Sequence, residues 1–165
     1  MSDGINIANL YAYNLHFQTT NFGNVFFRHL SNSSQLNVLS SWIAAANSQY
    51  SSFVATTGFL ITYDSVERNL APGQPSTFQI ILLTNRRRSF IMYNYGIVAT
   101  DSATIGYTDP YNSINTNTFS SNGTNFDGAT NVNITGKYIF QVNQDSNNIN
   151  FIIFFRIEFI YNLFL

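Results

Sequence analysis

The chain has 165 residues, no cysteine and a formal net charge of −1. Its length corresponds to about one domain, and its 45% apolar and 16% aromatic residues are too many for a disordered chain. Only 9% of the residues are charged, and the near-zero net charge excludes a general nucleic-acid binder, which needs a basic face. The lack of cysteine excludes disulfides, thiolate zinc sites and thiol catalysis.

The first predicted elements are a strand over 24–29 and one helix over 34–47. Seven apolar residues of the helix fall within half of its circumference, which is typical of a helix that lies on a core. These residues are Leu36, Val38, Leu39, Trp42, Ile43, Ala45 and Ala46. Polar residues, among them Ser40, fill the other half, and the run Ser31–Ser34 supplies possible N-caps.

After the helix the pattern becomes that of β-structure. Strands are predicted over 57–64, 77–83 and 89–95, because β-branched and aromatic residues fill these segments. The second and third strands are apolar at nearly every position, so we expect both of their faces to be covered. Residues 97–100 are predicted to continue as a further strand, and 137–142 form the last one. One helix among several strands favours a mainly β, antiparallel architecture.

The strands over 77–83 and 89–95 are predicted to form a hairpin with a five-residue loop over 84–88. In that register, aromatic and aliphatic side chains pair across the two strands. The expected sets are Phe78, Ile80 and Leu82 on the first strand, and Phe90 and Met92 on the second.

The loop of this hairpin holds the only charge cluster, Arg86, Arg87 and Arg88. Such a cluster fits an acidic partner, for example a sulfated glycan or a phosphate. The alternative is a solvated hairpin tip, where charges also discourage pairing between sheet edges. We expect the tip, and we keep the three arginines as possible partner contacts.

Residues 101–131 are rich in Asn, Ser and Thr and are predicted to be mostly loop. Their side-chain oxygens are the ligand type that calcium prefers, but their spacing does not match the acidic pattern of a helix–loop–helix calcium site. A turn-rich surface loop is the favoured interpretation, and whether calcium binds it stays open. The candidate ligands are Asp101, Asp109, Asn112, Asn115, Asn117 and Asp127.

Patterns for catalysis are sparse. The two histidines, His16 and His29, have no acidic residue near them in the sequence, and only Asp64 and Glu67 form a close pair of carboxylates. That pair follows a predicted strand and is typical of a turn. A glycoside hydrolase needs two carboxylates at a set distance across a pocket, and the sequence shows no sign of them. We therefore expect no enzyme, no cofactor and no catalytic or metal site.

Three N-x-[ST] sequons stand at Asn32, Asn122 and Asn133. Such sequons accept N-linked glycans in secreted proteins. A chain this rich in Asn, Ser and Thr contains sequons by chance, so these three are possible glycosylation sites and no more.

We expect one domain over residues 1–148, incomplete at its N-terminus, followed by an apolar tail over 149–165. The N-terminus lacks the basic and apolar regions of a secretory signal. The tail is too short for a membrane helix, which needs about 20 residues. It also carries Arg156 and Glu158.

An ordered series of segments runs NFGNVFFR, FLITYDSV, TFQIILLTNRRRSFIMYNYG, IGY and GKYIFQV, with the predicted helix after the first. This series, over about residues 10–142, resembles the NIDO domain, first described in nidogen and found also in alpha-tectorin and membrane mucins. The match is clearest at Thr77, Phe78, Gln79, Ser89, Phe90, Tyr95, Gly96, Gly106, Tyr107, Gly136, Lys137, Phe140 and Val142. The family usually has Trp where this chain has Tyr63.

The resemblance implies a β-rich fold, an antiparallel sheet or sandwich with one amphipathic helix packed on it. It implies a non-enzymatic extracellular module in cell–matrix adhesion, secreted or part of a membrane protein's ectodomain. Its partners would be extracellular matrix or cell-surface proteins or glycans, with no nucleic acid. The alternative is a structural spacer in a larger mosaic ectodomain, and a glycan-active enzyme is the third interpretation.

Overall fold

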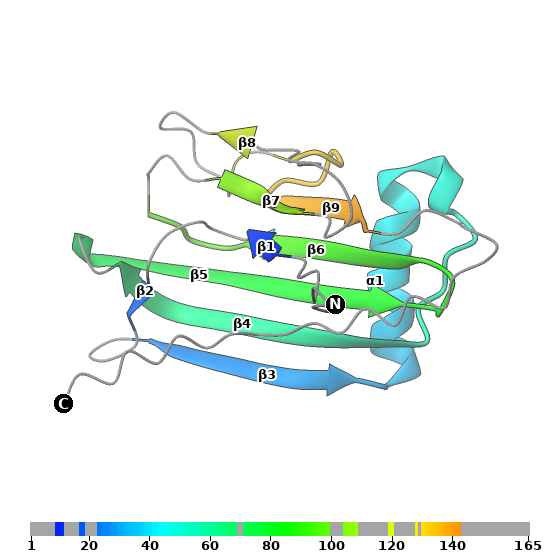
Figure 1. Cartoon of the computed structure of the whole chain (residues 1–165), viewed down its shortest axis with the longest axis horizontal. Helices are drawn as coiled ribbons and strands as arrows, with labels where there is room; N and C mark the ends of the chain where they lie inside the picture. The colour runs from blue at the N-terminus through cyan, green and yellow to red at the C-terminus, as the bar shows by residue number, and fades with distance from the viewer. Residues whose placement is uncertain are drawn as a thin grey trace, which may run out of the picture.

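The computed structural model describes residues 9–11, 17–18, 23–68, 71–99, 104–108, 119–120, 128 and 130–142. These residues hold two helices and nine strands, shown in Figure 1. In chain order the elements are β1 (Asn9–Tyr11), β2 (Phe17–Gln18), β3 (Asn24–Leu30), α1 (Ser33–Ala46), the 3-10 helix η1 (Ser48–Tyr50), β4 (Thr57–Arg68), β5 (Ala71–Thr84), β6 (Ser89–Tyr95), β7 (Thr104–Thr108), β8 (Phe119–Ser120) and β9 (Lys137–Gln141).

The main sheet is antiparallel throughout and has six strands. Its central path runs β4–β5–β6–β9, and both β3 and β2 pair with β4, each along a different stretch of that strand. A second sheet of three short strands, β1–β7–β8, packs on the face of the main sheet opposite α1. Helix α1 runs across the strand direction near one end of the main sheet (Figure 1). This architecture confirms the predicted mainly β fold with one helix.

Alternating side chains of the central strands form two separate cores, one on each face of the sheet. The core that faces α1 contains the T-shaped contacts of Phe90 with Tyr50 and Phe53, at 4.9 and 4.6 Å between ring centroids. Its buried members are Leu30, Leu36, Ile43, Phe53, Ala55, Ile81, Leu83, Phe90, Met92, Val132 and Ile139. These side chains fix α1 on the sheet by removing apolar surface from water.

The core on the opposite face mixes aliphatic and aromatic side chains and joins the main sheet to the small one. Ile105 of β7 is fully buried in it, and the Tyr93 hydroxyl donates a 2.7 Å hydrogen bond to the carbonyl of Gly106. Its buried members are Ile61, Val66, Phe78, Ile80, Leu82, Ile91, Tyr93, Tyr95, Val98, Ile105, Tyr138 and Phe140. The prediction that both faces of β5 and β6 are covered is therefore confirmed.

The hairpin of β5 and β6 is confirmed, but its predicted register is wrong by one residue. Thr84 pairs with Ser89, so only four residues form the loop. Because side chains alternate between faces, this shift exchanges the expected partners. The observed pairs are Phe78–Tyr95, Ile80–Tyr93, Leu82–Ile91, Leu83–Phe90 and Ile81–Met92.

The tight loop results from an Asx turn. The Asn85 side-chain oxygen accepts hydrogen bonds from the backbone N–H groups of Arg87 and Arg88, at 3.1 and 2.8 Å. Arg86 adopts a φ of 73°, in the left-handed region. This local hydrogen bonding reverses the chain with one residue fewer than the sequence pattern predicts.

Helix α1 is confirmed, with one difference in its packed side. Val38 is 53% exposed and Ala45 is also exposed, whereas Ser40, predicted on the polar side, is buried. Ser40 tolerates burial because its hydroxyl donates to the carbonyl of Leu36 at 2.7 Å and accepts from the N–H of Ala55 at 2.9 Å. The packed stripe is therefore rotated toward Ser40.

Further boundaries also differ from the prediction. Strands β4 and β5 are longer than expected, and residues 97–99 form no strand where one was predicted over 97–100. The segment predicted as loop, 101–131, contributes the short strands β7 and β8. The tail over 149–165 lies outside the described residues, so the domain boundary at 148 stays a prediction.

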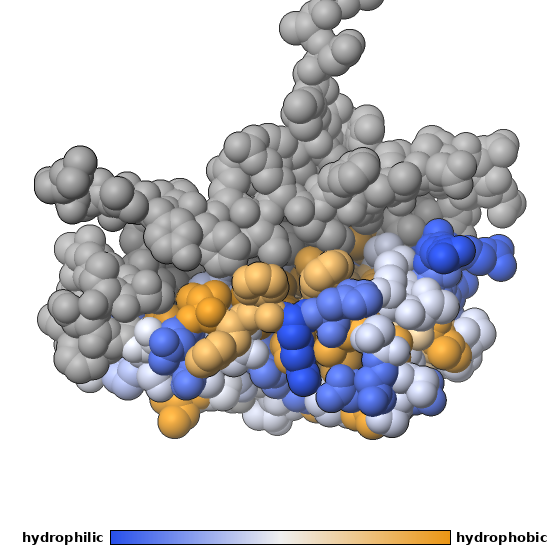
Figure 2. Space-filling view, turned by 90° about the horizontal axis from the view of Figure 1, so that it is seen from below, coloured by the Kyte–Doolittle hydropathy of each residue, from blue (hydrophilic) through white to orange (hydrophobic). Residues whose placement is uncertain are grey.

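Strand β3 lies at one edge of the main sheet, opposite the edge formed by β9 (Figure 1). Figure 2 views the molecule from this side, and apolar side chains there alternate with hydrophilic ones. Three phenylalanines are the large apolar residues exposed on β3 and β4, namely Phe26 at 56%, Phe27 at 70% and Phe59 at 46%.

Candidate functional site

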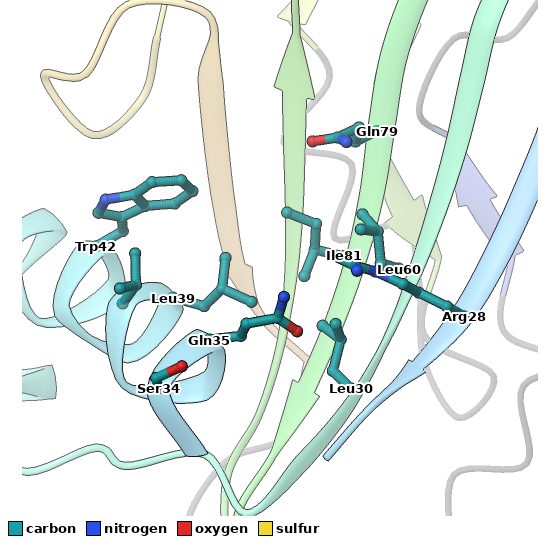
Figure 3. A pocket seen from close by; sticks show the side chains of 10 residues that line it. Arg28, Leu30, Ser34, Gln35, Leu39, Trp42, Leu60, Gln79 and Ile81 are labelled. Carbon is teal, nitrogen blue, oxygen red and sulfur yellow. The ribbon is translucent and has the colours of Figure 1, made fainter. Parts of the chain in front are cut away.

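A groove of about 350 Å³ lies between α1 and the main sheet. Helix α1 forms one wall, and β3, β4 and β5 form the other (Figure 3). The lining residues are Arg28, Leu30, Ser34, Gln35, Val38, Leu39, Trp42, Leu60, Gln79 and Ile81. The sequence places the groove there because only two residues separate the end of β3 from the start of α1, so the chain returns directly over the strand it has just left.

The floor of the groove is apolar and its rim is polar. Leu30 and Ile81 are buried, and Leu39, Trp42 and Leu60 pack partly buried against them. Arg28 reaches the groove from β3, and its side chain has no hydrogen-bond or ion-pair partner among the described residues. An unpaired guanidinium beside apolar surface is suited to a ligand that carries a carboxylate or sulfate.

A row of hydrogen-bonded polar side chains crosses four strands on the same face as the groove. The Gln79 amide donates to the Thr62 hydroxyl at 3.1 Å, and the Asn94 amide donates to Gln79 Oε1 at 3.0 Å. The row ends at Lys137, whose ammonium donates to Asn94 Oδ1 at 2.6 Å and lies 4.4 Å from the centroid of the Trp42 ring. Burial lowers the pKa of Lys137.

The polar row marks the point along β5 and β6 at which side chains on the α1 face change from apolar to polar. Where α1 covers the face, the strands place apolar side chains such as Ile81 and Met92. Beyond the helix the same strands place Gln79 and Asn94, which satisfy each other's hydrogen bonds and stay half-buried. From Thr62 to Lys137 this row is polar and fixed by hydrogen bonds, and Gln79 belongs to both the row and the groove. Fixed polar groups beside an apolar floor are the usual composition of a binding site.

The model of the nidogen-like domain family matches residues 2–144. The chain belongs to the nidogen-like domain family. Neither the curated proteins nor the solved structures contain a match to the chain. Nidogen-like domains are extracellular and non-catalytic modules. None of the described helices has the length and apolar character needed to cross a membrane.

In this nidogen-like domain the three arginines of the predicted contact cluster lie at the β5–β6 loop, as expected, but they are not equivalent. Arg86 and Arg87 are exposed. Arg88 is half-buried, and its guanidinium donates a 3.3 Å hydrogen bond to the carbonyl of Gln49 in η1. The loop is separate from the groove, since none of these arginines lines it. Their role in partner contact stays a prediction.

Two of the three sequons fall on described residues. Asn32 is exposed and caps α1, because its side-chain oxygen accepts hydrogen bonds from the N–H of Ser34 at 2.9 Å and of Gln35 at 3.4 Å. Asn133 is exposed in a turn, with a φ of 57°. Asn122 lies outside the described residues.

The other polar residues weighed from the sequence have structural contacts. His29 Nε2 lies 2.7 Å from the Thr57 hydroxyl, and its ring lies 5.2 Å from Phe59. Asp64 and Glu67 lie within β4 and not in a turn after it, as was predicted, and Asp64 accepts a hydrogen bond from its neighbour Ser65. The described residues contain no group of three His, Cys, Asp or Glu able to hold a metal ion. Residue His16 and the candidate calcium ligands Asp101, Asp109, Asn112, Asn115, Asn117 and Asp127 lie outside the described part of the chain.

Sequence reasoning missed the groove and the polar row. The available signal was the polar residue that stands among large apolar neighbours in each strand, Gln79 after Phe78 in β5 and Asn94 between two tyrosines in β6. In the observed register these two residues are directly opposite each other. In the predicted register they are not, which is why they did not stand out as a pair.

Proposed function

We propose that this nidogen-like domain is an extracellular interaction module in cell–matrix adhesion and that the groove between α1 and the sheet binds its partner. The family match over residues 2–144 carries the proposal. The groove supports it, because it combines an apolar floor with the guanidinium of Arg28, which has no partner among the described residues, and with the hydrogen-bonded amide of Gln79. An extracellular location for this chain follows from the same match.

The groove also indicates the chemistry of the partner. An apolar segment would occupy the floor over Leu30 and Ile81, and an acidic group beside it would pair with Arg28. Acidic side chains of a matrix protein and sulfated or carboxylated glycans share this chemistry. The lining residues include no Asp or Glu, so the groove offers no carboxylate for glycan hydrolysis.

Two valines of nearly equal exposure provide a matched test. Val38 lines the groove and is 53% exposed, whereas Val54 is 56% exposed and does not line it. Binding of the full chain to a panel of matrix proteins and acidic glycans would be measured by surface plasmon resonance. A Val38→Glu change should weaken binding about tenfold or more, because it places a negative charge beside an acidic ligand. The Val54→Glu change should leave binding within about twofold.

The outcomes separate the proposal from its alternatives. If both variants bind as well as the unchanged chain, the partner contacts another surface, and Arg86 and Arg87 become the next residues to change. If the unchanged chain binds nothing in the panel, the structural spacer interpretation is favoured instead.

A further inference from the structure

We propose that two copies of this chain associate through the free edges of β3, which join the two main sheets into one continuous antiparallel sheet. Strand β3 pairs with β4 along all seven of its residues, from Asn24 to Leu30. No other described strand pairs with its outer edge. That edge therefore presents a row of backbone N–H and C=O groups ready to pair with another strand.

Strand β3 has few of the features by which monomeric proteins protect such an edge. Edges are usually blocked by charged side chains, lysine above all, by proline, by a bulge or by a covering segment, and the one formally charged side chain of β3 is Arg28. Strand β3 contains neither lysine nor proline, and its pairing with β4 has no bulge. It exposes an aromatic side chain on each face of the sheet instead, Phe26 on the α1 face and Phe27 on the other. A second strand would cover both.

Pairing of β3 with itself is complementary in one register. Full overlap of the seven residues places Phe27 on the two-fold axis, opposite the partner's Phe27. Phe26 then lies opposite the partner's Arg28, and Arg28 lies opposite the partner's Phe26. Arg28 has no hydrogen-bond or ion-pair partner among the described residues, and a guanidinium beside an exposed aromatic ring is a cation–π pair. Each copy therefore supplies the cation that the other copy's aromatic ring lacks.

This arrangement has a geometric consequence for the grooves. The two-fold axis of an antiparallel edge pair is perpendicular to the sheet, so both α1 helices lie on the same face. Arg28 lines the groove, so the partner's Phe26 would stand at the open side of each groove. The dimer would present two grooves side by side, which raises the apparent affinity for a repetitive surface. Association itself does not depend on what the grooves bind.

Sedimentation velocity of the full chain over a concentration series tests the association. We expect a concentration-dependent dimer, which the Phe27→Lys variant weakens about tenfold or more, because lysine at the edge opposes pairing. Ile97 is 73% exposed and lies after β6, away from β3, so Ile97→Lys is the matched control and should leave the dimer unchanged. A chain that stays monomeric overturns the proposal, and a strand of another protein then becomes the candidate to pair with the β3 edge. A dimer that survives Phe27→Lys also overturns it.

The absence of cysteine allows a direct test of the register. Opposed residues of antiparallel strands have Cα atoms about 4.5–5.5 Å apart, within the range of a disulfide. The single variant Phe27→Cys should therefore form a covalent dimer under mild oxidation, detected on a non-reducing gel. Phe26→Cys, whose opposite residue is the partner's Arg28, should form far less. Efficient cross-linking at position 26 and not at 27 would overturn the register.

Discussion

Strands β3 and β6 are both seven residues long and rich in aromatic side chains, yet their environments differ. Five of the seven residues of β6 are buried, whereas β3 has one buried residue, Leu30. Strand β6 lies between β5 and β9 and carries a core on each face. Among the described strands, β3 has one neighbour, β4. The difference shows that burial of an aromatic strand is set by its neighbours more than by its own composition.

The largest expected effect is the loss of a central side chain. Phe90 of β6 is 1% exposed and packs edge-on against Phe53. The change Phe90→Ala should lower the free energy of unfolding by about 3–5 kcal/mol, because it removes buried apolar surface and leaves a cavity. Urea denaturation followed by circular dichroism measures this. A loss below about 1 kcal/mol would mean that the core collapses around the gap.

The next largest effect concerns the attachment of α1, which packs over β6. The buried hydroxyl of Ser40 links α1 to the segment before β4 through the N–H of Ala55. The change Ser40→Ala leaves that buried N–H without its partner and should cost about 1–3 kcal/mol. Amide hydrogen exchange should show faster exchange at Ala55 than in the unchanged chain. Ser41→Ala is the control, since Ser41 is exposed. Equal stabilities for the two variants would show that the hydrogen bond from Ala55 to Ser40 contributes nothing, since the gain in helix propensity from Ser to Ala is the same at both positions.

A smaller effect is expected on the edge strand. Phe27 is 70% exposed, so Phe27→Ala should cost about 1 kcal/mol or less in the monomer. Thermal unfolding at low protein concentration, beside Phe90→Ala, tests the contrast between the two strands. Similar losses for the two phenylalanines would remove the distinction between β3 and β6.

The smallest effect is expected at the loop of the central hairpin. Arg87 is exposed, and Arg87→Ala should change stability by less than about 0.5 kcal/mol. Arg88→Ala should cost more than Arg87→Ala, because Arg88 hydrogen-bonds to η1. Denaturant midpoints of the two variants give the comparison, and an equal result would show that the contact with η1 contributes nothing to stability.

The helix and strands β3, β4, β5, β6 and β9 could be predicted from the sequence, because their patterns of apolar residues are strong. The short strands β1, β2, β7 and β8 could not, because two to five residues are too few to show a period. The pairing of β5 with β6 could also be predicted, but its register could not. The register depends on the number of residues in the loop, and hydrogen bonds of the Asn85 side chain set that number. An error of one residue exchanges the two faces of a strand, which is why Phe90 was expected opposite Leu82 and lies opposite Leu83.

The candidate site was less predictable than the fold. To predict the polar row from the sequence, the registers of three strand pairs must all be right: β4 with β5, β5 with β6, and β6 with β9. Only then do Thr62, Gln79, Asn94 and Lys137 lie next to one another. The groove also depends on which side of α1 faces the sheet. The hydrogen bond between Ser40 and Ala55 turns a side toward the sheet that the apolar pattern of the helix does not predict. The arginine cluster could be found in the sequence because its three residues are consecutive. The residues that line the groove come from four separate elements and are not adjacent in the sequence.

The cap of α1 has a consequence for how a cell would modify this surface. Asn32 uses its side-chain oxygen to start the helix, whereas an N-linked sugar is attached through the side-chain nitrogen. Sugar attachment and the helix start are therefore compatible on one residue. The N–H groups of Ser34 and Gln35 donate to the Asn32 side chain, and both of these residues line the groove. A glycan at Asn32 would stand beside the groove mouth and restrict the size of the partners that enter, without a change in the fold.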